Sequence, residues 1–286
     1  MKLLAIDSSG LVASVAVQSD DILVGEYTIH NKKTHSQTLL PMIAEMLEMA
    51  EIDKHELDAI AVAAGPGSFT GLRIGAATAK GLAQALNIPI VPVSTLMGLA
   101  YNLQGCEALV CPIMDARRSQ AYSCVYDVRD NHDSDDKTGS VLLTENDDSD
   151  KSDTIKLIPA RMCDEAAEPI ETIIDRLKEW NREVIFLGDG VPVFRERIIS
   201  ELGLADGSVN ASDSDTPDVS EQSSENGMTS GLARFSSDAA RYQRASSIVA
   251  LGRILFEKGH AVPAADFAPG YLRKSQAERE REEGRK

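Results

Sequence analysis

The sequence predicts an α/β protein made of two consecutive βββαβα units. Apolar segments of strand length and amphipathic segments of helix length follow one another in the same order in both halves of the 286-residue chain. Asp7 and Asp115 each end the first predicted strand of a half. In both halves a glycine turn, within "AAGPGSF" and "FLGDGVPVF", joins the fourth strand to the second helix. These parallels favour a duplicated plan over its alternative, a coincidental alternation of strands and helices.

The first unit covers residues 1–104. "KLLAID" is an apolar strand that ends at a Ser-Ser-Gly turn, and "HSQTLLPMIAEMLEMA" has the apolar spacing of an amphipathic helix. We therefore expect strands at 2–7, 12–18, 22–29 and 59–65, helices at 35–50 and 71–86, and a connection at 88–103 that leads to the second unit.

The second unit covers residues 105–260 and is followed by a C-terminal tail, 261–286. Here we expect a strand hairpin at 108–128, a third strand at 154–160, a fourth at 183–190, helices at 168–180 and 191–202, and a closing helix at 245–259. Duplicated units of this kind are the plan of the actin-like ATPase (ASKHA) fold, which places a nucleotide in the cleft between its two halves.

Composition excludes several classes of protein. Of the net charge of −16, −13 lies in residues 127–153 and 205–226, which have few apolar residues; we interpret them as disordered acidic insertions near 129–152 and 206–230. The rest of the chain is nearly neutral and has no basic stripe, so we do not expect it to bind nucleic acid unaided. No apolar run reaches the roughly 20 residues of a membrane span. The four cysteines have no CxxC spacing and predict reduced thiols in a cytoplasmic protein.

The loop in "AVAAGPGSFTGLRIG", residues 61–75, resembles a phosphate-binding loop but does not match either common motif. Neither a P-loop lysine nor the third glycine of a dinucleotide fingerprint is present. Gly71, Gly75 and Ala79 recur every four residues and leave a bare helix face to which another backbone can come close. We therefore interpret the loop as a fixed turn whose helix is capped by Ser68 or Thr70.

The helix predicted at 35–50 has an apolar stripe wider than a core contact requires. Met42 and Met49 widen it to about 180°, compared with the roughly 100° that faces a core. Adaptable methionines at the edges of the stripe favour a second contact surface, and the alternative is that they fill an irregular core.

Five segments resemble the TsaB (YeaZ) family in order and spacing: "AIDSS", "HSQTLLPMI", "GPGSFTGLRIG", "MDARRSQAY" and "PGYLR". The resemblance implies an actin-like fold and a non-catalytic subunit of the bacterial machinery that makes N6-threonylcarbamoyladenosine in tRNA. It implies the partners TsaD, which transfers the threonylcarbamoyl group, and TsaE, an ATPase. It also implies a homodimer when the chain is alone, contact with tRNA only through the complex, no membrane association and a cytoplasmic location.

The resemblance places the TsaD interface on the two helices of the first unit, for which we expect His35, Leu39, Met42, Met46, Met49, Gly71, Arg73, Gly75 and Ala79. A vestigial nucleotide site would involve Asp7, Ser8, Ser9, Gly188 and Gly190. We predict no metal site, because no two histidines have the i, i+4 spacing of a helical metal pair. We also predict no catalytic residue, because the sequence places no histidine near the turn serines, and no cofactor, because the phosphate-binding motifs do not match. Asp115 and Arg117 are expected to fix a hairpin turn. The main alternative is an independent ATPase or kinase-like enzyme, and a peptidase is the weakest.

Overall fold

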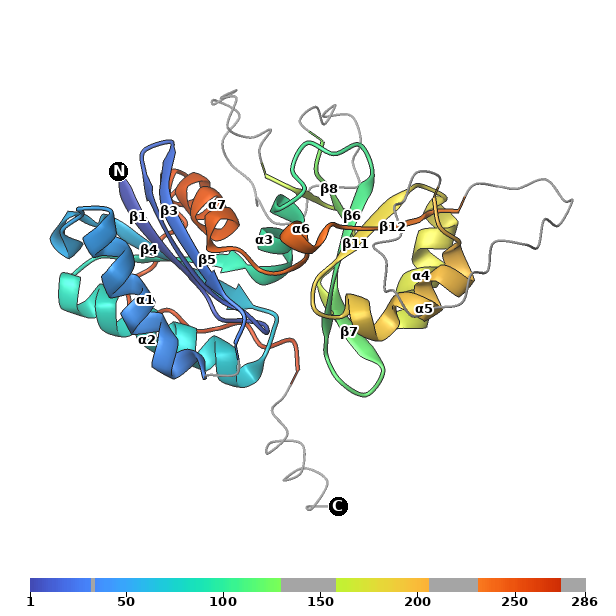
Figure 1. Cartoon of the computed structure of the whole chain (residues 1–286), viewed down its shortest axis with the longest axis horizontal. Helices are drawn as coiled ribbons and strands as arrows, with labels where there is room; N and C mark the ends of the chain where they lie inside the picture. Colours follow the sequence, from blue (N-terminus) through green and yellow to red (C-terminus); the bar gives the residue numbers. More distant parts are fainter. Residues whose placement is uncertain (32–33, 130–157, 206–230, 274–286) are drawn as a thin grey trace, which may run out of the picture.

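The computed structural model describes four stretches of the chain, residues 1–31, 34–129, 158–205 and 231–273. Almost all of both predicted acidic insertions lies outside these residues. The described chain forms two lobes, each with a β-sheet and helices that cover it, and the strands of the first sheet all come from residues 2–94 (Figure 1).

The first lobe contains a five-stranded sheet in the order β3-β2-β1-β4-β5. Its first three strands form an antiparallel meander, whereas β4 and β5 run parallel to β1. The central strands are buried on both faces, which explains their nearly continuous apolar sequences. The strands are β1 (Lys2–Asp7), β2 (Ala13–Ser19), β3 (Ile22–Ile29), β4 (Ala59–Gly65) and β5 (Ile90–Ser94).

Helices cover both faces of this sheet. On one face, α1 (His35–Met49) and α2 (Phe69–Leu86) pack side by side over a core of leucine, isoleucine, valine and methionine (Figure 1). On the other face, α7 (Ala245–Glu257) contacts β1, β2, β4 and β5. The sheet is rich in alanine there, and a Cβ on Gly252 of α7 would lie 2.5 Å from the Cβ of Ala61. Small residues on both sides therefore bring α7 close to the first sheet, although its sequence position lies within the predicted second unit.

The second lobe repeats the strand order of the first, because its main sheet runs β10-β7-β6-β11-β12. Helices α4 and α5 pack on the core of this sheet as α1 and α2 do in the first lobe. The matching order confirms that the two halves share one plan. The strands and helices are β6 (Leu109–Asp115), β7 (Gln120–Ser123), β10 (Ala166–Pro169), β11 (Val184–Leu187), β12 (Ala233–Phe235), α4 (Ile170–Trp180) and α5 (Val191–Leu202).

The third strand of the second unit is not where the sequence placed it. The predicted strand at 154–160 lies mostly outside the described residues, and the third strand is β10, which pairs with β7. Two short strands, β8 (Tyr126–Asp127) and β9 (Ala160–Arg161), pair with each other before it. "TIKLIPA" is more apolar than "AAEP", so hydropathy alone favoured the wrong segment; pairing with β7 decides the position.

Three short helices complete the described chain: η1 (Lys54–Glu56), α3 (Thr95–Tyr101) and α6 (Asp238–Arg241). Helix α3 follows β5 directly and contacts β6, so it links the two lobes (Figure 1). The C-terminal segment after α7 returns along the first lobe, where Val262 bridges to Ile90 and Phe267 is buried in the core.

Candidate functional site

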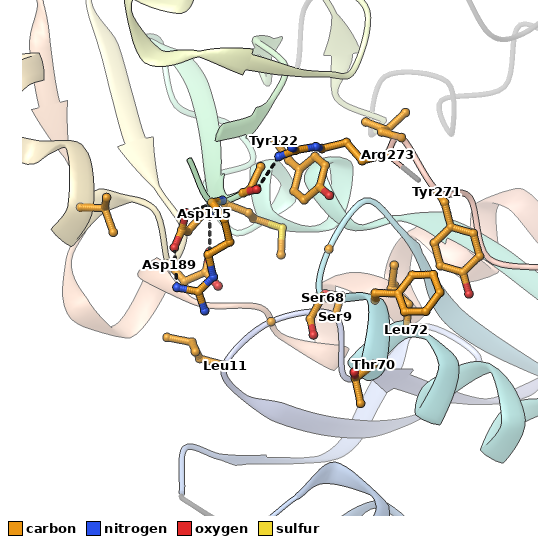
Figure 2. A pocket seen from close by; sticks show the side chains of 18 of the residues that line it. Ser9, Leu11, Ser68, Thr70, Leu72, Asp115, Tyr122, Asp189, Tyr271 and Arg273 are labelled. Carbon is orange, nitrogen blue, oxygen red and sulfur yellow. Dashed lines mark hydrogen bonds and ion pairs between the residues drawn. The ribbon is translucent and has the colours of Figure 1, made fainter. Parts of the chain in front are cut away.

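A cavity of about 780 Å³ opens between the two lobes. The first lobe contributes Ser9, Gly10 and Leu11 after β1 and the start of α2. The second lobe contributes the β6–β7 turn and Asp189, and the C-terminal segment contributes residues 270–273 (Figure 2). The cavity lies at the carboxyl ends of β1 and β6, which is where open α/β sheets place their ligands.

Asp7 is turned toward its own loop rather than toward the cavity. Its Oδ1 accepts hydrogen bonds from the backbone N–H of Ser9, at 2.9 Å, and from the Ser9 hydroxyl, at 2.6 Å. Its side chain is buried, and burial raises the pKa of this carboxyl from 3.8 to about 6. Asp7 therefore stabilises the Ser-Ser-Gly turn, and both donors of Ser9 are already used there.

The glycine-rich loop before α2 packs directly onto this turn. The Ser68 N–H donates to the Ser9 carbonyl at 2.7 Å, and a Cβ on Gly67 would lie 2.5 Å from the same oxygen. Of the two predicted caps, Ser68 and Thr70, it is Ser68 that forms the N-cap of α2. Its hydroxyl accepts a hydrogen bond from the Gly71 N–H at 3.3 Å. These contacts confirm the interpretation of the loop as a fixed strand-to-helix turn.

The bare face of α2 contacts the same turn. The Ser8 hydroxyl donates to the Gly71 carbonyl at 2.9 Å. A Cβ on Gly71 would lie 2.0 Å from the Ser8 carbonyl oxygen, and one on Gly75 would lie 2.5 Å from the Ser8 hydroxyl. The close approach that the glycines permit is therefore made within this chain.

The glycine turn of the second lobe is equally tight. Gly188 has φ +105°, and a Cβ there would lie 2.2 Å from the Ile113 carbonyl. The N–H groups of Gly188 and Gly190 donate to the carbonyls of Arg241 and Ile113. Of the five residues predicted for a vestigial nucleotide site, only Ser9 is among those that line the cavity.

Two carboxylates approach each other on the second-lobe wall (Figure 2). Asp189 Oδ1 accepts from the Asp115 N–H at 3.2 Å, and Asp115 forms an ion pair with Arg117 at 3.1 Å. Burial raises the pKa of Asp189 from 3.8 to about 6, and the negative charge of Asp115 adds to that effect. The expectation that Asp115 and Arg117 fix a hairpin turn agrees with this geometry, and the Arg117 N–H donates to Asp115 at 2.7 Å.

The part of the cavity wall that comes from the C-terminal segment was not predicted from the sequence. The Gly270 N–H donates to the Ala64 carbonyl at 2.7 Å, and Arg273 donates to the Ala116 carbonyl at 2.6 Å, so the segment bridges both lobes. Tyr271 packs against Phe69 with ring centroids 4.9 Å apart. "PGYLR", one of the five segments of the resemblance, was the signal that could have indicated this role.

The residues predicted for a partner interface divide into two groups. Arg73 and Met49 are exposed, Met49 at 73%, and His35 is partly buried with Nε2 3.0 Å from the Gly10 carbonyl. The other six are buried within the chain: Leu39, Met42, Met46, Gly71, Gly75 and Ala79.

Met42, which the sequence placed at the edge of the stripe, is 4% exposed and belongs to the core. The alternative that methionine fills an irregular core is therefore correct for Met42. The helical wheel failed there because α1 is covered on more than one side, by its sheet and by α2.

The described residues contain no group of three or more histidine, cysteine, aspartate or glutamate side chains placed to hold a metal ion. None of their helices combines the length and the apolar character needed to cross a membrane.

Comparison with known proteins gives consistent relatives. Residues 23–281 match a family model described as TsaD, tRNA N6-adenosine threonylcarbamoyltransferase. The chain is 33% identical over 203 residues to the tRNA threonylcarbamoyladenosine biosynthesis protein TsaB of Bacillus subtilis, a match that covers 71% of this chain and 77% of that one. It is 35% identical over 129 residues to the protein of the same name from Escherichia coli, covering 44% of this chain and 55% of the relative. The solved structure of YeaZ from Pseudomonas aeruginosa superposes with a TM-score of 0.65 at 25% identity, covering 95% of this chain and 99% of that one.

Proposed function

The chain belongs to the TsaB (YeaZ) family, and from this premise we propose that it is a non-catalytic subunit in the biosynthesis of threonylcarbamoyladenosine in tRNA. Its role is to dock the catalytic subunit TsaD, with TsaE joining the complex. Alone it forms a homodimer, it meets tRNA only through the complex, and it acts in the cytoplasm. We assign its duplicated sheets to the actin-like ATPase fold.

The non-catalytic assignment rests on one observation: the turns that would correspond to phosphate-binding loops already use their polar groups in hydrogen bonds within the chain. In an actin-like ATPase these turns would present polar groups to a nucleotide. Here the Asp7 carboxylate is bonded to Ser9, and the Ser68 N–H is bonded to the Ser9 carbonyl. The N–H groups of Gly188 and Gly190 also donate to carbonyls of the chain. A phosphate would have to displace these hydrogen bonds, several of them in buried positions.

The docking surface that we propose is the solvent face of α1 and α2. Leu40 and Met49 are 53% and 73% exposed, and Arg73 lies over the Phe69 ring at 4.0 Å, which holds its guanidinium on the same pair of helices. Exposed apolar side chains and an ordered arginine on the same pair of helices are residue types enriched at interface centres. The buried residues of the predicted interface support this surface from beneath.

The proposal is tested by measuring TsaD affinity for Met49→Glu, with Ile22→Glu as the matched control. Ile22 is 65% exposed on the edge strand β3, so both changes place a charge at an exposed apolar position and should leave folding almost unchanged. We expect Met49→Glu to weaken TsaD binding by about thirtyfold, which corresponds to about 2 kcal/mol. Equal affinity for both variants and the unchanged chain would place the docking surface elsewhere.

The alternative, an independent ATPase or kinase-like enzyme, is tested by titration of the chain with ATP and Mg²⁺. We expect no tight binding of ATP, because a phosphate group would have to displace the hydrogen bonds that these turns make within the chain. Micromolar affinity that is lost in Asp7→Ala would contradict the non-catalytic role.

A further inference from the structure

Two cysteines that are distant in sequence lie together in the second lobe. Cys124 directly follows β7, and Cys163 lies between β9 and β10, 39 positions later. Their sulfurs are 4.0 Å apart, and the Cys124 S–H donates to the Cys163 carbonyl at 2.9 Å. A disulfide needs the sulfurs at about 2.05 Å, so an approach of about 2 Å would join them. Cys163 is in a connection between two short strands, where such a shift disturbs little pairing.

The surroundings give the two sulfurs different chemistry. The Val125 N–H donates to Cys163 Sγ at 3.4 Å, and Arg176 Nη1 lies 3.7 Å from it. The hydrogen bond with Cys124, the Val125 N–H and the charge of Arg176 lower the pKa of the Cys163 thiol, and they outweigh burial and the negative charge of Glu168, which raise it. Glu168 forms an ion pair with Arg176 at 3.0 Å, so the arginine acts on Cys163 with this carboxylate beside it. Cys124 is 1% exposed, and burial raises the pKa of its thiol. Cys163 is partly exposed, so it is the sulfur that a small reagent can reach as a thiolate.

The other two cysteines are built differently and serve as internal controls. Cys111 is fully buried beside the Ser123 hydroxyl, at 3.4 Å, and burial raises the pKa of its thiol to about 12. Cys106 donates to the Ala108 carbonyl at 3.4 Å, and burial raises the pKa of its thiol too. The hydrogen bonds of these two thiols are made to oxygen atoms, and although Arg176 and Cys163 act on Cys111 and Arg234 acts on Cys106 electrostatically, burial is the largest influence on both pKa values.

We propose that Cys163 and Cys124 form an oxidation-sensitive dithiol site whose oxidant is a small hydroperoxide. The Cys163 thiolate attacks the terminal oxygen of ROOH; the O–O bond breaks, an S–O bond forms, and with one proton the products are Cys163 sulfenic acid and ROH. The Cys124 sulfur then attacks the Cys163 sulfur, forming the S–S bond and releasing water. Overall the two thiols lose two electrons, and the peroxide is reduced to one alcohol and one water.

The site is adjacent to a contact between the lobes. Glu165, two residues after Cys163, accepts hydrogen bonds from the Tyr126 hydroxyl at 2.8 Å and from Arg161 at 2.9 Å. Glu165 also accepts a hydrogen bond from the hydroxyl of Ser94. Ser94 is the last residue of β5 in the first sheet and the N-cap of α3. Oxidation would close a covalent loop of 39 positions and limit the unfolded chain, so we expect a higher melting temperature after oxidation.

Peptide mapping of the full chain tests the proposal directly. The chain is treated with a small excess of cumene hydroperoxide, its remaining thiols are blocked with N-ethylmaleimide, and it is digested with trypsin. Cleavage after Arg118, Arg129, Arg161 and Arg176 puts Cys124 in peptide 119–129 and Cys163 in peptide 162–176, and both other cysteines in one separate peptide. We expect 119–129 and 162–176 linked by a disulfide that dithiothreitol reverses, with Cys106 and Cys111 blocked by maleimide.

Variants assign the roles. In Cys124→Ser, dimedone should trap a sulfenic acid at Cys163, whereas Cys111→Ser should leave the linked pair unchanged. In Arg176→Gln, the pH profile of Cys163 oxidation should move to higher pH, with about a tenfold slower reaction near neutral pH for each unit of the shift. Arg176→Lys should restore most of the rate. The proposal is overturned if the hydroperoxide oxidises Cys106 first, or if no 119–129 to 162–176 pair appears; an unchanged pH profile in Arg176→Gln overturns the role of the arginine.

Discussion

Replacing Gly75 by alanine tests the close contact between α2 and the Ser-Ser-Gly turn that follows β1. A Cβ at this position would lie 2.5 Å from the Ser8 hydroxyl, where about 3.4 Å is normal, and the next atoms, of Ser8 and Ile6, are 3.9 and 4.0 Å away. The hydroxyl would have to rotate away and lose its hydrogen bond to the Gly71 carbonyl. Overpacking and the lost bond together cost about 3 kcal/mol, and the better helix propensity of alanine returns about 1 kcal/mol. We expect Gly75→Ala to lower the free energy of unfolding by about 2 kcal/mol.

A double mutant makes this reasoning refutable. Ser8→Ala alone removes one hydrogen bond and should cost about 1 kcal/mol. With Ser8 truncated, nothing lies closer than 3.9 Å to the new Cβ, so Ser8→Ala/Gly75→Ala should have nearly the stability of the unchanged chain. The two changes are then coupled by about 3 kcal/mol, whereas independent sites would add.

Urea denaturation followed by far-ultraviolet circular dichroism measures all three variants. Gly81→Ala on the same helix is the matched control, because nothing lies within 4 Å of its Cβ; it should stabilise the chain by about 1 kcal/mol. Additive losses in the double mutant, or a Gly75→Ala variant as stable as Gly81→Ala, would show that the Ser8 contact does not decide the stability.

Three further predictions concern the core, the pH dependence and the C-terminal segment. The pKa of Asp7 is about 6 when folded, so the folded chain holds this proton to a higher pH than the unfolded chain does, and the free energy of unfolding falls between pH 4 and pH 6. Asp7→Asn should remove that part of the fall and add about 3 kcal/mol at pH 7 in denaturation measured across the pH range. Met42→Glu buries an unpaired charge and should prevent cooperative unfolding in circular dichroism, whereas Leu40→Glu, at a 53% exposed position, should fold normally. Lys80→Met removes donors to two carbonyls of the C-terminal segment, at 2.9 and 3.1 Å, and should speed hydrogen exchange at the Gly270 amide by about tenfold.

Several local features of the structure could be predicted from the sequence, because they depend on interactions between residues that are close together in the chain. Apolar runs predicted β1 and β4 almost to the residue, since a strand buried on both faces must be apolar throughout. Ser68 was identified among two candidate caps, because a hydroxyl just before a helix can satisfy an open N–H. The four-residue spacing of Gly71 and Gly75 correctly indicated that something comes close to α2.

The sequence did not show which groups contact α1 and α2. A bare helix face indicates that a backbone comes close to it. The same glycine spacing would accommodate either a partner protein or a turn of the same chain, so it does not identify the approaching segment. The structure puts Ser8 there, so the glycines that were assigned to an interface belong to the internal packing. The wide stripe of α1 likewise reports burial, but it does not separate Met42, which is in the core, from Met49, which is exposed.

The sequence by itself determined the order β1-β2-β3-α1-β4-α2 of the first unit, the duplicated plan and the family resemblance, because periodicity and motif spacing are properties of neighbouring residues, whereas the last strands of the two sheets, β5 and β12, were not predicted. Only the tertiary structure decided that α7 covers the first sheet, that β10 is the third strand of the second sheet and that "PGYLR" lines the cavity. It also decided that Cys124 and Cys163 meet. Each of these is a contact between segments far apart in the chain, and its free energy depends on shape, register and hydrogen-bond geometry that no local pattern encodes.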